Sequence, residues 1–480
     1  MKVDEPFDST PLNEDAEAGE AQEPVEVLPL AEDYDAPIPA LRNVRAQIVK
    51  LTDKDGQPSG DESGDDDQTV VVLEDPEGLA PKPAILSTWA YALAAMFDGR
   101  RSARQAAEQL SVRAGQPVEP ESVLELQREL DRAMFLYSRR FEKTVRRQIR
   151  SYLEKDIRAA THAGTAYPEE PEALQQTVTG FFTAKDGPGA PWAVPAGVAA
   201  ADAPAAKPVD HTLGALILPH IDLRIGGATY AHGYAELLKH SEADLFVILG
   251  VAHQMNGEGL YYISQKDFAT PLGPVKTDKG MARRLQTAAD VEPVLGELAH
   301  RTEHSVEFQA VLLAVLLQAC KREFEIVPVL CGSVETLLAN EVNLLTAGPV
   351  TKFAEALRQE LVASKRKWCV LCSVDLTHVG PEFSNSTMMT PRLLPPVERY
   401  DRRLLGLIAR QDLQGLCDEI GRTQNSRHVD AITAVLTMLK ACRGMLKPGR
   451  LLHYDQMLKD GTHSAVSFAS LAFDRECAGK

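Results

Sequence analysis

An alternation of short apolar runs with helix-like segments, from residue 213 onward, most constrains how this chain can fold. The first run, Ala215–Leu218, is followed closely by His220. Four consecutive apolar residues predict a buried strand. A histidine just beyond such a strand lies where open α/β sheets place their ligands. The paired glycine Gly226-Gly227 then precedes a helix-like run, and we expect it to let the backbone turn tightly before that helix.

Later segments repeat this order of strand and helix, which predicts an α/β fold with a layered mixed sheet flanked by helices. The helices intervene between the strands, notably at Val306–Ala319 and Ala431–Ala441. The spacing does not fix the order of the strands in the sheet. The strand candidates are Ala215–Leu218, Leu245–Leu249, Leu260–Ser264, Glu325–Leu330, Cys369–Ser373 and Ala465–Phe473.

The acidity of the chain is concentrated at its N-terminus. Residues 1–80 contain 22 Asp or Glu and 5 Lys or Arg, which accounts for the whole net charge of −17. Residues 1–40 combine this acidity with few large apolar side chains, so we expect a disordered acidic tail there. The rest of the chain is balanced in charge, and no broad basic face for nucleic acid is expected.

Residues 41–137 predict a small α+β domain. Two β-like runs, Val44–Leu51 and Thr69–Leu73, are followed by three short helices. This order is similar to the winged-helix domains of peptide-chaperone modules in bacterial maturation systems. The third helix is rich in Glu, and a helix that reads DNA would have to neutralise phosphates. A protein contact or a purely structural role is therefore favoured.

A connector helix is predicted over residues 138–159. Its apolar residues recur every four positions, and basic residues, Arg158 among them, cover its other faces. This pattern is typical of a solvated amphipathic connector. The alternative is a dock for the acidic tail or for an acidic partner. The α/β domain then occupies residues 160–480 and contains a loop rich in Pro and Ala over residues 183–212.

The sequence predicts a cytoplasmic protein without a membrane segment. The stretch Met1–Ser9 is acidic and lacks the apolar core of a signal peptide. The longest apolar run, near Ala310–Ala319, is too short to cross a bilayer. All seven cysteines follow residue 319. An odd, clustered set of this kind is typical of reduced thiols in the cytosol.

Four loops next to predicted strands and helices carry side chains suited to metal binding or proton transfer. Because the carboxyl ends of neighbouring parallel strands meet at one edge of a sheet, we expect these loops to share a cleft. Two imidazoles and one carboxylate suit a divalent first-row metal with open positions. Such an ion can polarise an oxygen or bind dioxygen. The candidate residues are His220, His253, Glu303, His304, Asp375 and His378.

Two other readings of these patterns remain. Asp375 and His378 could form a metal-free pair of general base and orienting group, although the sequence has no G-x-S-x-G nucleophile elbow. Cys369 and Cys372 form a C-x-x-C pattern. Residues three apart in a strand point to opposite faces, so we expect these two to be buried structural thiols rather than a chelating pair.

Seven segments in order along residues 158–474 resemble the Memo-like protein family. They are ATHAGTAYPEEPEALQQTVTGFF, PHIDLRIGGATYA, LGVAHQ, EHSVEFQ, SVDLTHVG, SRHVDAITAVL and SAVSFASLAF. The resemblance implies an α/β fold related to the class III extradiol ring-cleaving dioxygenases. It also implies a pocket that binds iron or copper through two histidines and a cysteine.

Carried over to this chain, the family's two histidines fall on His220 and His253, and the cysteine falls on Asn425. Asparagine binds transition metals poorly. The resemblance therefore leaves two alternatives: Glu303, His304 or Asp375 completes the site, with Cys331 as a more distant candidate, or the site is degenerate.

The resemblance implies two alternative functions. One is a metal-dependent redox or dioxygenase-like enzyme that acts on a small molecule or a protein-bound substrate. Glu303, His304, Asp375 and His378 would then be its catalytic groups. The other is a non-catalytic scaffold that binds a protein or peptide in the old pocket. Bacterial relatives often accompany a radical SAM protein, which is the partner that the resemblance implies.

Overall fold

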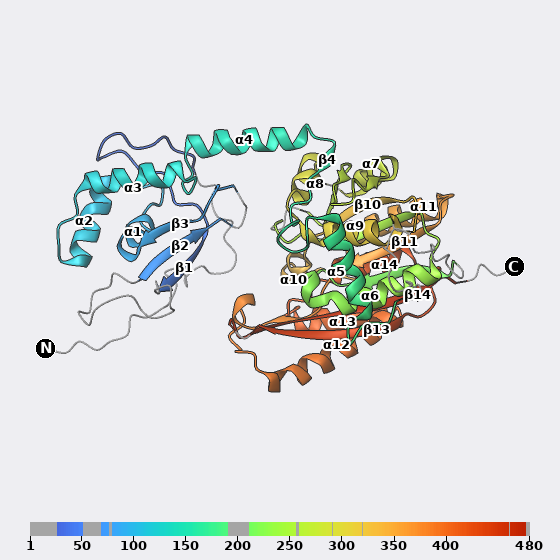
Figure 1. The fold of residues 1–480 in the computed structure, drawn as a ribbon. Helices are drawn as coiled ribbons and strands as arrows, with labels where there is room; N and C mark the ends of the chain where they lie inside the picture. Colours follow the sequence, from blue (N-terminus) through green and yellow to red (C-terminus); the bar gives the residue numbers. More distant parts are fainter. Residues whose placement is uncertain are drawn as a thin grey trace. The chain divides into compact units, whose positions relative to one another are not determined.

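The computed structural model describes residues 26–50, 69–75, 79–190, 211–255, 259–289, 291–318, 320–459 and 461–476. The chain divides into two compact units, Met1–Ser151 (unit one) and Tyr152–Lys480 (unit two), and both can be followed in Figure 1. Residues 1–25 of the predicted tail and residues 191–210 of the predicted loop lie outside the described residues.

Unit one contains a three-stranded antiparallel sheet and short helices. Its elements are β1 (Arg45–Lys50), β2 (Thr69–Glu74), β3 (Ala84–Ser87), α1 (Thr88–Ala94), α2 (Ala103–Ala114), α3 (Pro120–Arg132) and α4 (Arg139–Leu153), the last of which runs into unit two. The strands lie in the order β1-β2-β3. Ser87 and Ser102 cap α1 and α2 by accepting backbone N–H bonds. The likeness to a winged helix stays a prediction.

The second part of the predicted tail packs onto unit one. Ala31 and Ile38 are buried. The side-chain amide of Gln127 accepts the backbone N–H of Ala31 at 2.9 Å and donates to its carbonyl at 3.1 Å. Leu28 donates its N–H to the carbonyl of Tyr137. The expected disorder is therefore wrong for residues 26–40, because a few apolar anchors and one buried amide hold this segment in place.

Helix α4 ends earlier than the predicted connector helix. The side chain of Lys266 donates to the carbonyl of Leu153 at 3.2 Å and also to that of Lys155, so it satisfies carbonyls at the helix end. Residues Ile157–Arg158 then form strand β4. Arg158 is fully buried, so it is not part of a solvated basic face.

Unit two is an α/β domain with a mixed nine-stranded sheet. The nine strands of this sheet are β5 (Leu213–Leu218), β6 (Leu245–Val251), β7 (Tyr261–Ile263), β9 (Lys276–Thr277), β10 (Glu325–Cys331), β11 (Trp368–Ser373), β12 (His378–Val379), β13 (Arg450–Lys459) and β14 (Ser464–Asp474). Strand β4 pairs with β8 (Asp267–Phe268) in a separate two-stranded sheet. The main order is β12-β14-β5-β11-β6-β10-β7, with β13 paired to β14 and β9 paired to β10. Strands β5, β11, β6 and β10 run parallel, whereas β14 pairs antiparallel with β5.

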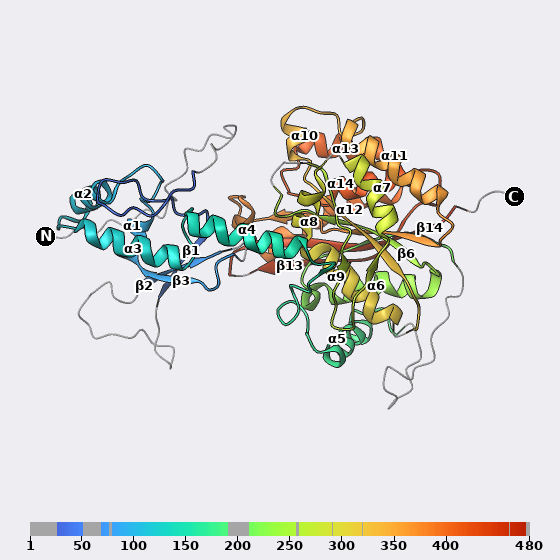
Figure 2. The same cartoon turned by 90° about the horizontal axis from the view of Figure 1, so that it is seen from above.

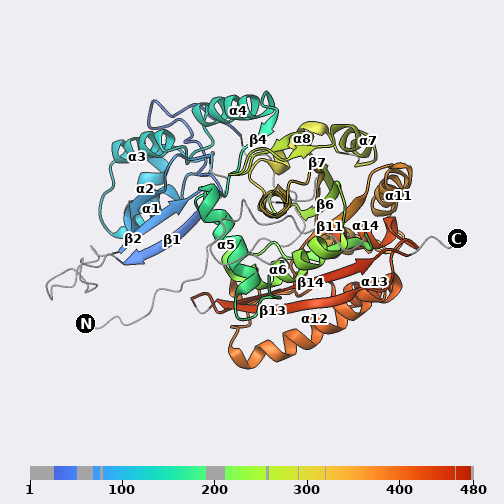
Figure 3. The same ribbon diagram turned by 45° about the vertical axis from the view of Figure 1, so that its right-hand side comes forward.

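Helices cover both faces of this sheet. They are α5 (Pro171–Thr183), α6 (Leu223–His240), α7 (Lys279–Ala289), α8 (Pro293–His300), α9 (His304–Leu313), α10 (Glu335–Ala339), α11 (Gly348–Ala363), α12 (Leu394–Ala409), α13 (Leu413–Thr423) and α14 (Ile432–Ala441). A π-helical turn, Ala314–Gln318, extends α9, and 3-10 turns occur at Pro381–Phe383 and Pro391–Leu393. In Figure 2, α11 and α14 lie on one side of the sheet and α5 and α6 on the other. Figure 3 shows the long pair β13 and β14 beside α12.

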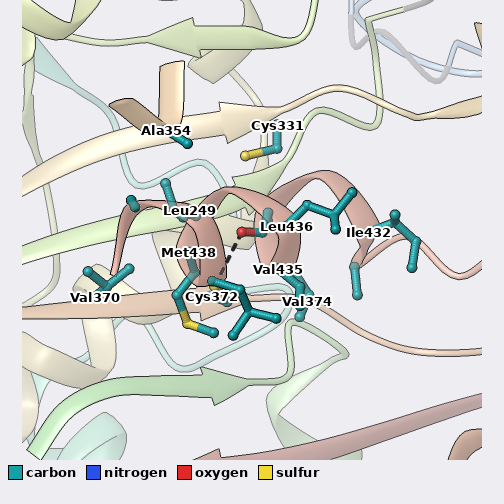
Figure 4. Close-up of a cluster of buried hydrophobic side chains, with 14 of the residues drawn as sticks. Leu249, Cys331, Ala354, Val370, Cys372, Val374, Ile432, Val435, Leu436 and Met438 are labelled. Carbon is teal, nitrogen blue, oxygen red and sulfur yellow. Dashed lines mark hydrogen bonds between the residues drawn. The ribbon is translucent and has the colours of Figure 1, made fainter. Parts of the chain in front are cut away.

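Each face of the sheet has its own apolar core. Helix α14 lies over Leu249, Val370 and Cys372 on one face (Figure 4). Cys369 belongs to the core on the opposite face. The two cysteines of the C-x-x-C pattern are thus separated by the sheet, as the strand geometry predicts. Among the described residues, no helix has both the length and the apolar character needed to span a bilayer.

The paired glycine serves close packing and not a turn. Gly226 and Gly227 lie inside α6, near its start. A Cβ on Gly227 would lie 2.4 Å from the ring of Phe181 in α5, and one on Gly226 would lie 2.6 Å from Ile221. The expected turn is therefore wrong, and the two glycines instead let α5 and the preceding loop approach the helix.

Candidate metal centre

Three neighbouring parallel strands present one candidate side chain each at the same distance from the strand end. His220, His253 and Asp375 each lie two residues beyond the last residue of β5, β6 and β11. These strands are adjacent in the order β5-β11-β6, and Leu218 is paired with Ser373. The register of the sheet therefore brings the three loops to one edge.

Three histidines meet at this edge. One ring nitrogen from each of His220, His253 and His304 lies within 4.8 Å of the others. The ring centroids are 4.8 Å apart for His220 and His253, 5.1 Å for His220 and His304, and 4.9 Å for His253 and His304. His304 reaches the site because it is the first residue of α9, a helix whose Val306 and Phe308 pack into the core on the β-sheet.

The Nδ1 atom of each of these imidazoles faces a carboxylate. Glu303 lies 3.0 Å from Nδ1 of His253 and 3.1 Å from Nδ1 of His304, while Asp375 lies 3.3 Å from Nδ1 of His220. Glu303 thereby assigns the proton of His253 and of His304 to Nδ1 in the neutral ring and leaves the lone pair on Nε2, whereas Nδ1 of His220 lies near Asp375 without a hydrogen bond of suitable geometry. Carboxylates orient metal-binding histidines in this way in known sites.

Glu303 links this arrangement to the start of α9. Its side chain also accepts the backbone N–H of Ser305 at 3.0 Å, which caps the helix, and the backbone N–H of His253 at 3.1 Å. Burial acts to raise the pKa of Glu303, but His253 and His304 beside it hold that pKa well below its ordinary value. Glu303 therefore stays ionised as an acceptor for both rings.

A residue that the sequence analysis did not single out, Asp430, completes the floor of the site. Its Oδ1 accepts the backbone N–H of Asp375 at 3.0 Å, and its Oδ2 lies 3.0 Å from Nε2 of His220. Although these two atoms are close and buried, neither has a hydrogen-bond partner of suitable geometry within the described residues. Buried polar atoms without partners are costly, so both atoms are suited to a shared cation.

At the floor of the site, His220, Asp375 and Asp430 influence one another's pKa values. Burial opposes the charged form of His220, but Asp375 and Asp430 outweigh burial and raise its pKa to about 9. Burial also acts to raise the pKa of Asp430, which His220 holds below its ordinary value, whereas burial raises the pKa of Asp375. Asp430 is therefore the more readily ionised carboxylate of the two.

His378 lies on the other side of Asp430. Its Nε2 is 4.0 Å from Oδ2 of Asp430, and its Nδ1 lies 3.1 Å from the carbonyls of Leu376 and His428. Two carbonyl acceptors require the proton on Nδ1, so Nε2 of the neutral ring carries a lone pair. The ring packs edge-on against Phe383, with centroids 5.0 Å apart. The orientation of the His378 ring is thus fixed, with Nε2 directed to the site.

Asn425, the residue onto which the resemblance carries the family's cysteine, makes other contacts. Its Nδ2 donates to Glu335 at 2.8 Å and to the carbonyl of Val429 at 3.1 Å, and its Oδ1 accepts the N–H of Val429 at 3.1 Å. All polar atoms of this buried side chain are therefore engaged in holding the loop that precedes Asp430. The structure brings His304 to His220 and His253, with Asn425 bonded elsewhere.

The site is open to solvent on one side. The side chains of His253 and His304 are 35% and 31% exposed, whereas those of His220, Glu303 and Asp375 are 3% exposed or less. The buried members fix the geometry, and the two exposed rings are accessible to an ion or a substrate.

A buried network of side chains lies near His304, and the sequence did not predict that its members contact one another. Arg158 and Glu307 form an ion pair with both side chains at most 1% exposed. Glu307 also accepts hydrogen bonds from Tyr167 and from the backbone N–H of His162. His162 and Tyr167 belong to the segment ATHAGTAYP, and Glu307 to EHSVEFQ. Both segments are among those that resemble the Memo-like family. This was the signal in the sequence that could have indicated a contact between them.

Comparisons with known proteins support the resemblance to the Memo-like family. The family described as Memo-like protein matches residues 158–472. A MEMO1 family protein of Aquifex aeolicus is 26% identical over 420 residues, which cover 87% of this chain and 98% of that protein. A MEMO1 family protein of Pyrococcus furiosus is 26% identical over 320 residues, covering 66% of this chain and 98% of the relative.

A third relative, a MEMO1 family protein of Methanobrevibacter smithii, is 29% identical over 226 residues, or 47% of this chain and 71% of the relative. The Aquifex alignment is too long to fit within unit two, so it reaches into unit one. The family match covers almost all of unit two, including the whole nine-stranded sheet except the last two residues of β14. The chain therefore belongs to the Memo-like protein family.

Proposed function

We propose that unit two is a metal-dependent enzyme whose ion is held by His220, His253 and His304. The observation that carries this proposal is the convergence of three ring nitrogens within 4.8 Å. Glu303 behind Nδ1 of both His253 and His304 supports it further, because this carboxylate leaves Nε2 of each of these rings free to bind a cation. His304, which the sequence suggested as a catalytic group, is assigned here as a ligand.

The reaction class we propose is redox or dioxygenase-like chemistry on a small molecule or a protein-bound substrate. A bound iron or copper ion would supply redox capacity and polarise a substrate oxygen. The protein side chains do the remaining work. Glu303 and Asp375 keep the imidazoles oriented, and His378 accepts a proton from the substrate at Nε2.

Metal content measures this proposal directly. The protein is loaded anaerobically with Fe(II), and separately with Cu(I), and bound metal per chain is determined after desalting. We expect about one ion per chain in the wild type and a loss of most of it in H220A, H253A and H304A. His232→Ala is the matched control, since His232 stacks on His453 in α6 and β13, away from the cluster. Unchanged metal content in all three site variants would rule the proposal out.

The second candidate function is partner binding through unit one. Ile85 in its sheet is 69% exposed, Val49 on the same face by the strand register is 38% exposed, and Trp89 is 39% exposed. Contiguous patches of exposed apolar side chains are typical of interaction surfaces. The family resemblance suggests a radical SAM protein as the partner. Co-purification with that protein should be lost in I85D and kept in H220A; equal capture by I85D and the wild type would count against this role.

A further inference from the structure

We infer that Asp430 is the anionic ligand of the metal centre and that it takes over the part played by the family's cysteine. This inference rests on the proposed function, because it adds an oxygen donor beside His220 and His253. It also specifies the cofactor: a divalent first-row cation bound by nitrogen and oxygen.

The first observation is the position of the Asp430 carboxylate. Oδ2 of Asp430 lies 3.0 Å from Nε2 of His220 and 3.9 Å from Nε2 of His253. Donors that share one tetrahedral ion at about 2.0–2.2 Å lie roughly 3.4 Å from one another. The two distances bracket that value, so a single ion can reach all three atoms with small side-chain shifts.

The second observation concerns the hydrogen bonding of Asp430 and His220. Oδ1 is bonded to the backbone N–H of Asp375, which fixes the carboxylate plane. Oδ2 and both ring nitrogens of His220 are buried without a hydrogen-bond partner of suitable geometry in the described part of the chain. The side chain of His220 is only 3% exposed. A cation between Oδ2 and Nε2 would satisfy one unpartnered atom on each residue.

The third observation is the conformation of the loop before Asp430. Gln424, Asn425 and His428 all have left-handed backbone angles, with φ of 49°, 46° and 46°. Asparagine tolerates this conformation better than most residues. The three hydrogen bonds of Asn425 to Glu335 and Val429 hold the loop in this shape. Asn425 is thus a positioning residue for Asp430.

The donor set selects the kind of ion. Imidazole suits Zn, Fe, Ni and Cu, and carboxylate suits harder divalent cations, whereas thiolate favours Cu(I). With a carboxylate in place of a thiolate, we expect the site to prefer a divalent cation such as Fe(II), Mn(II), Co(II) or Zn(II) over Cu(I).

Co(II) is the probe for the test, because its visible absorption reports the donor atoms around it. The full-length metal-free protein is titrated anaerobically with CoCl2, using the wild type, Asp430→Asn and Asp418→Asn. Asp418 is an exposed carboxylate of α13 and serves as the control. We expect Asp430→Asn to lower the affinity at least tenfold and to change the cobalt spectrum, and Asp418→Asn to change neither.

Each outcome is assigned in advance. Equal affinity and an identical spectrum in Asp430→Asn would overturn the role of Asp430, and the metal centre itself would stand if H220A and H253A still lose cobalt. Absence of cobalt binding in the wild type would overturn both proposals. If circular dichroism shows that Asp430→Asn is unfolded, Asp430→Cys decides. A sulfur-to-cobalt charge-transfer band in Asp430→Cys supports the inference, and cobalt binding without that band overturns it.

Discussion

At the scale of single residues, Glu307 is a buried carboxylate whose charge contributes to stability. It is buried against the guanidinium of Arg158 and accepts further hydrogen bonds from Tyr167 and His162. Burial opposes its ionisation, but His162 and Arg158 outweigh burial and lower its pKa to about 2 from an ordinary value of 4.5. The network therefore stabilises the fold only while this group is ionised.

The sign of the pH dependence follows from that lowered pKa. The stability contributed by Glu307, roughly 3 kcal/mol for a shift of this size, is complete above about pH 4.5 and is lost as the pH falls towards 2. We expect Glu307→Gln to be less stable than the wild type at pH 7 by about 3 kcal/mol, and the difference to shrink on acidification. Urea unfolding at a series of pH values measures this. Glu355→Gln, at an exposed position of α11, should show no such convergence.

Asn425 gives a second prediction at this scale, because restoring the family's cysteine should harm the protein. Asn425→Cys removes three hydrogen bonds from the loop before Asp430. We expect a loss of about 1–3 kcal/mol in the free energy of unfolding, together with weaker cobalt binding. Thermal unfolding and cobalt titration of the same preparation check both effects. Tighter binding in this variant would show that position 425 still faces the ion.

At the scale of elements, most strands of unit two were predictable and their order was not. The predicted strand Ala215–Leu218 lies within β5, and Cys369–Ser373 lies within β11, because unbroken apolar runs are typical of strands buried on both faces. Strand β13 was missed. Its residues are mostly half-buried, so no clear alternation marks it, and its pairing with β14 depends on a neighbour in the sheet.

The contact between α5 and α6 gives a prediction at the element scale. A Cβ on Gly227 would lie 2.4 Å from the ring of Phe181, whereas a Cβ on Gly180 of α5 would have no atom within 4 Å. We expect Gly227→Ala to destabilise unit two by roughly 1–3 kcal/mol through overpacking. Gly180→Ala should stabilise it by about 0.5–1 kcal/mol, since alanine favours the helix. Chemical denaturation compares the two variants, and equal effects would contradict the packing argument.

The candidate site was predictable in part for the same physical reasons. His220, His253 and Asp375 could be found because each follows an apolar run that marks a strand. Asp430 could not, because it stands before a helix, where an acidic residue is common for reasons of helix capping and dipole. Its role depends on contacts with Asp375 and His220, residues far from it along the chain.

At the scale of the whole molecule, the cysteines report the integrity of the fold. Of the six cysteines that the structure describes, Cys320 is partly exposed and five are buried. Burial raises the pKa of Cys369 to about 12, as it does for Cys442. Since the thiolate is the reactive form, these buried groups should be inert in the folded protein. Cys477 lies outside the described residues.

We therefore expect brief iodoacetamide treatment of the native protein, mapped by mass spectrometry, to label Cys320 far faster than the five buried cysteines. Labelling of the buried set should appear only at denaturant concentrations that unfold unit two. Cys320→Ser is the control for the assignment of the fast site. Fast labelling of Cys369 or Cys372 in native buffer would contradict the burial of these strands.

The dual role of Glu303 has a consequence for how the protein would release its ion. One carboxylate both begins α9 and orients His253 and His304. Unwinding the first turn of this helix would therefore turn two imidazoles away from the cluster at once. Binding of any molecule that unwinds the start of α9 would therefore release the ion. Retention of the ion would in turn show that this helical turn is intact.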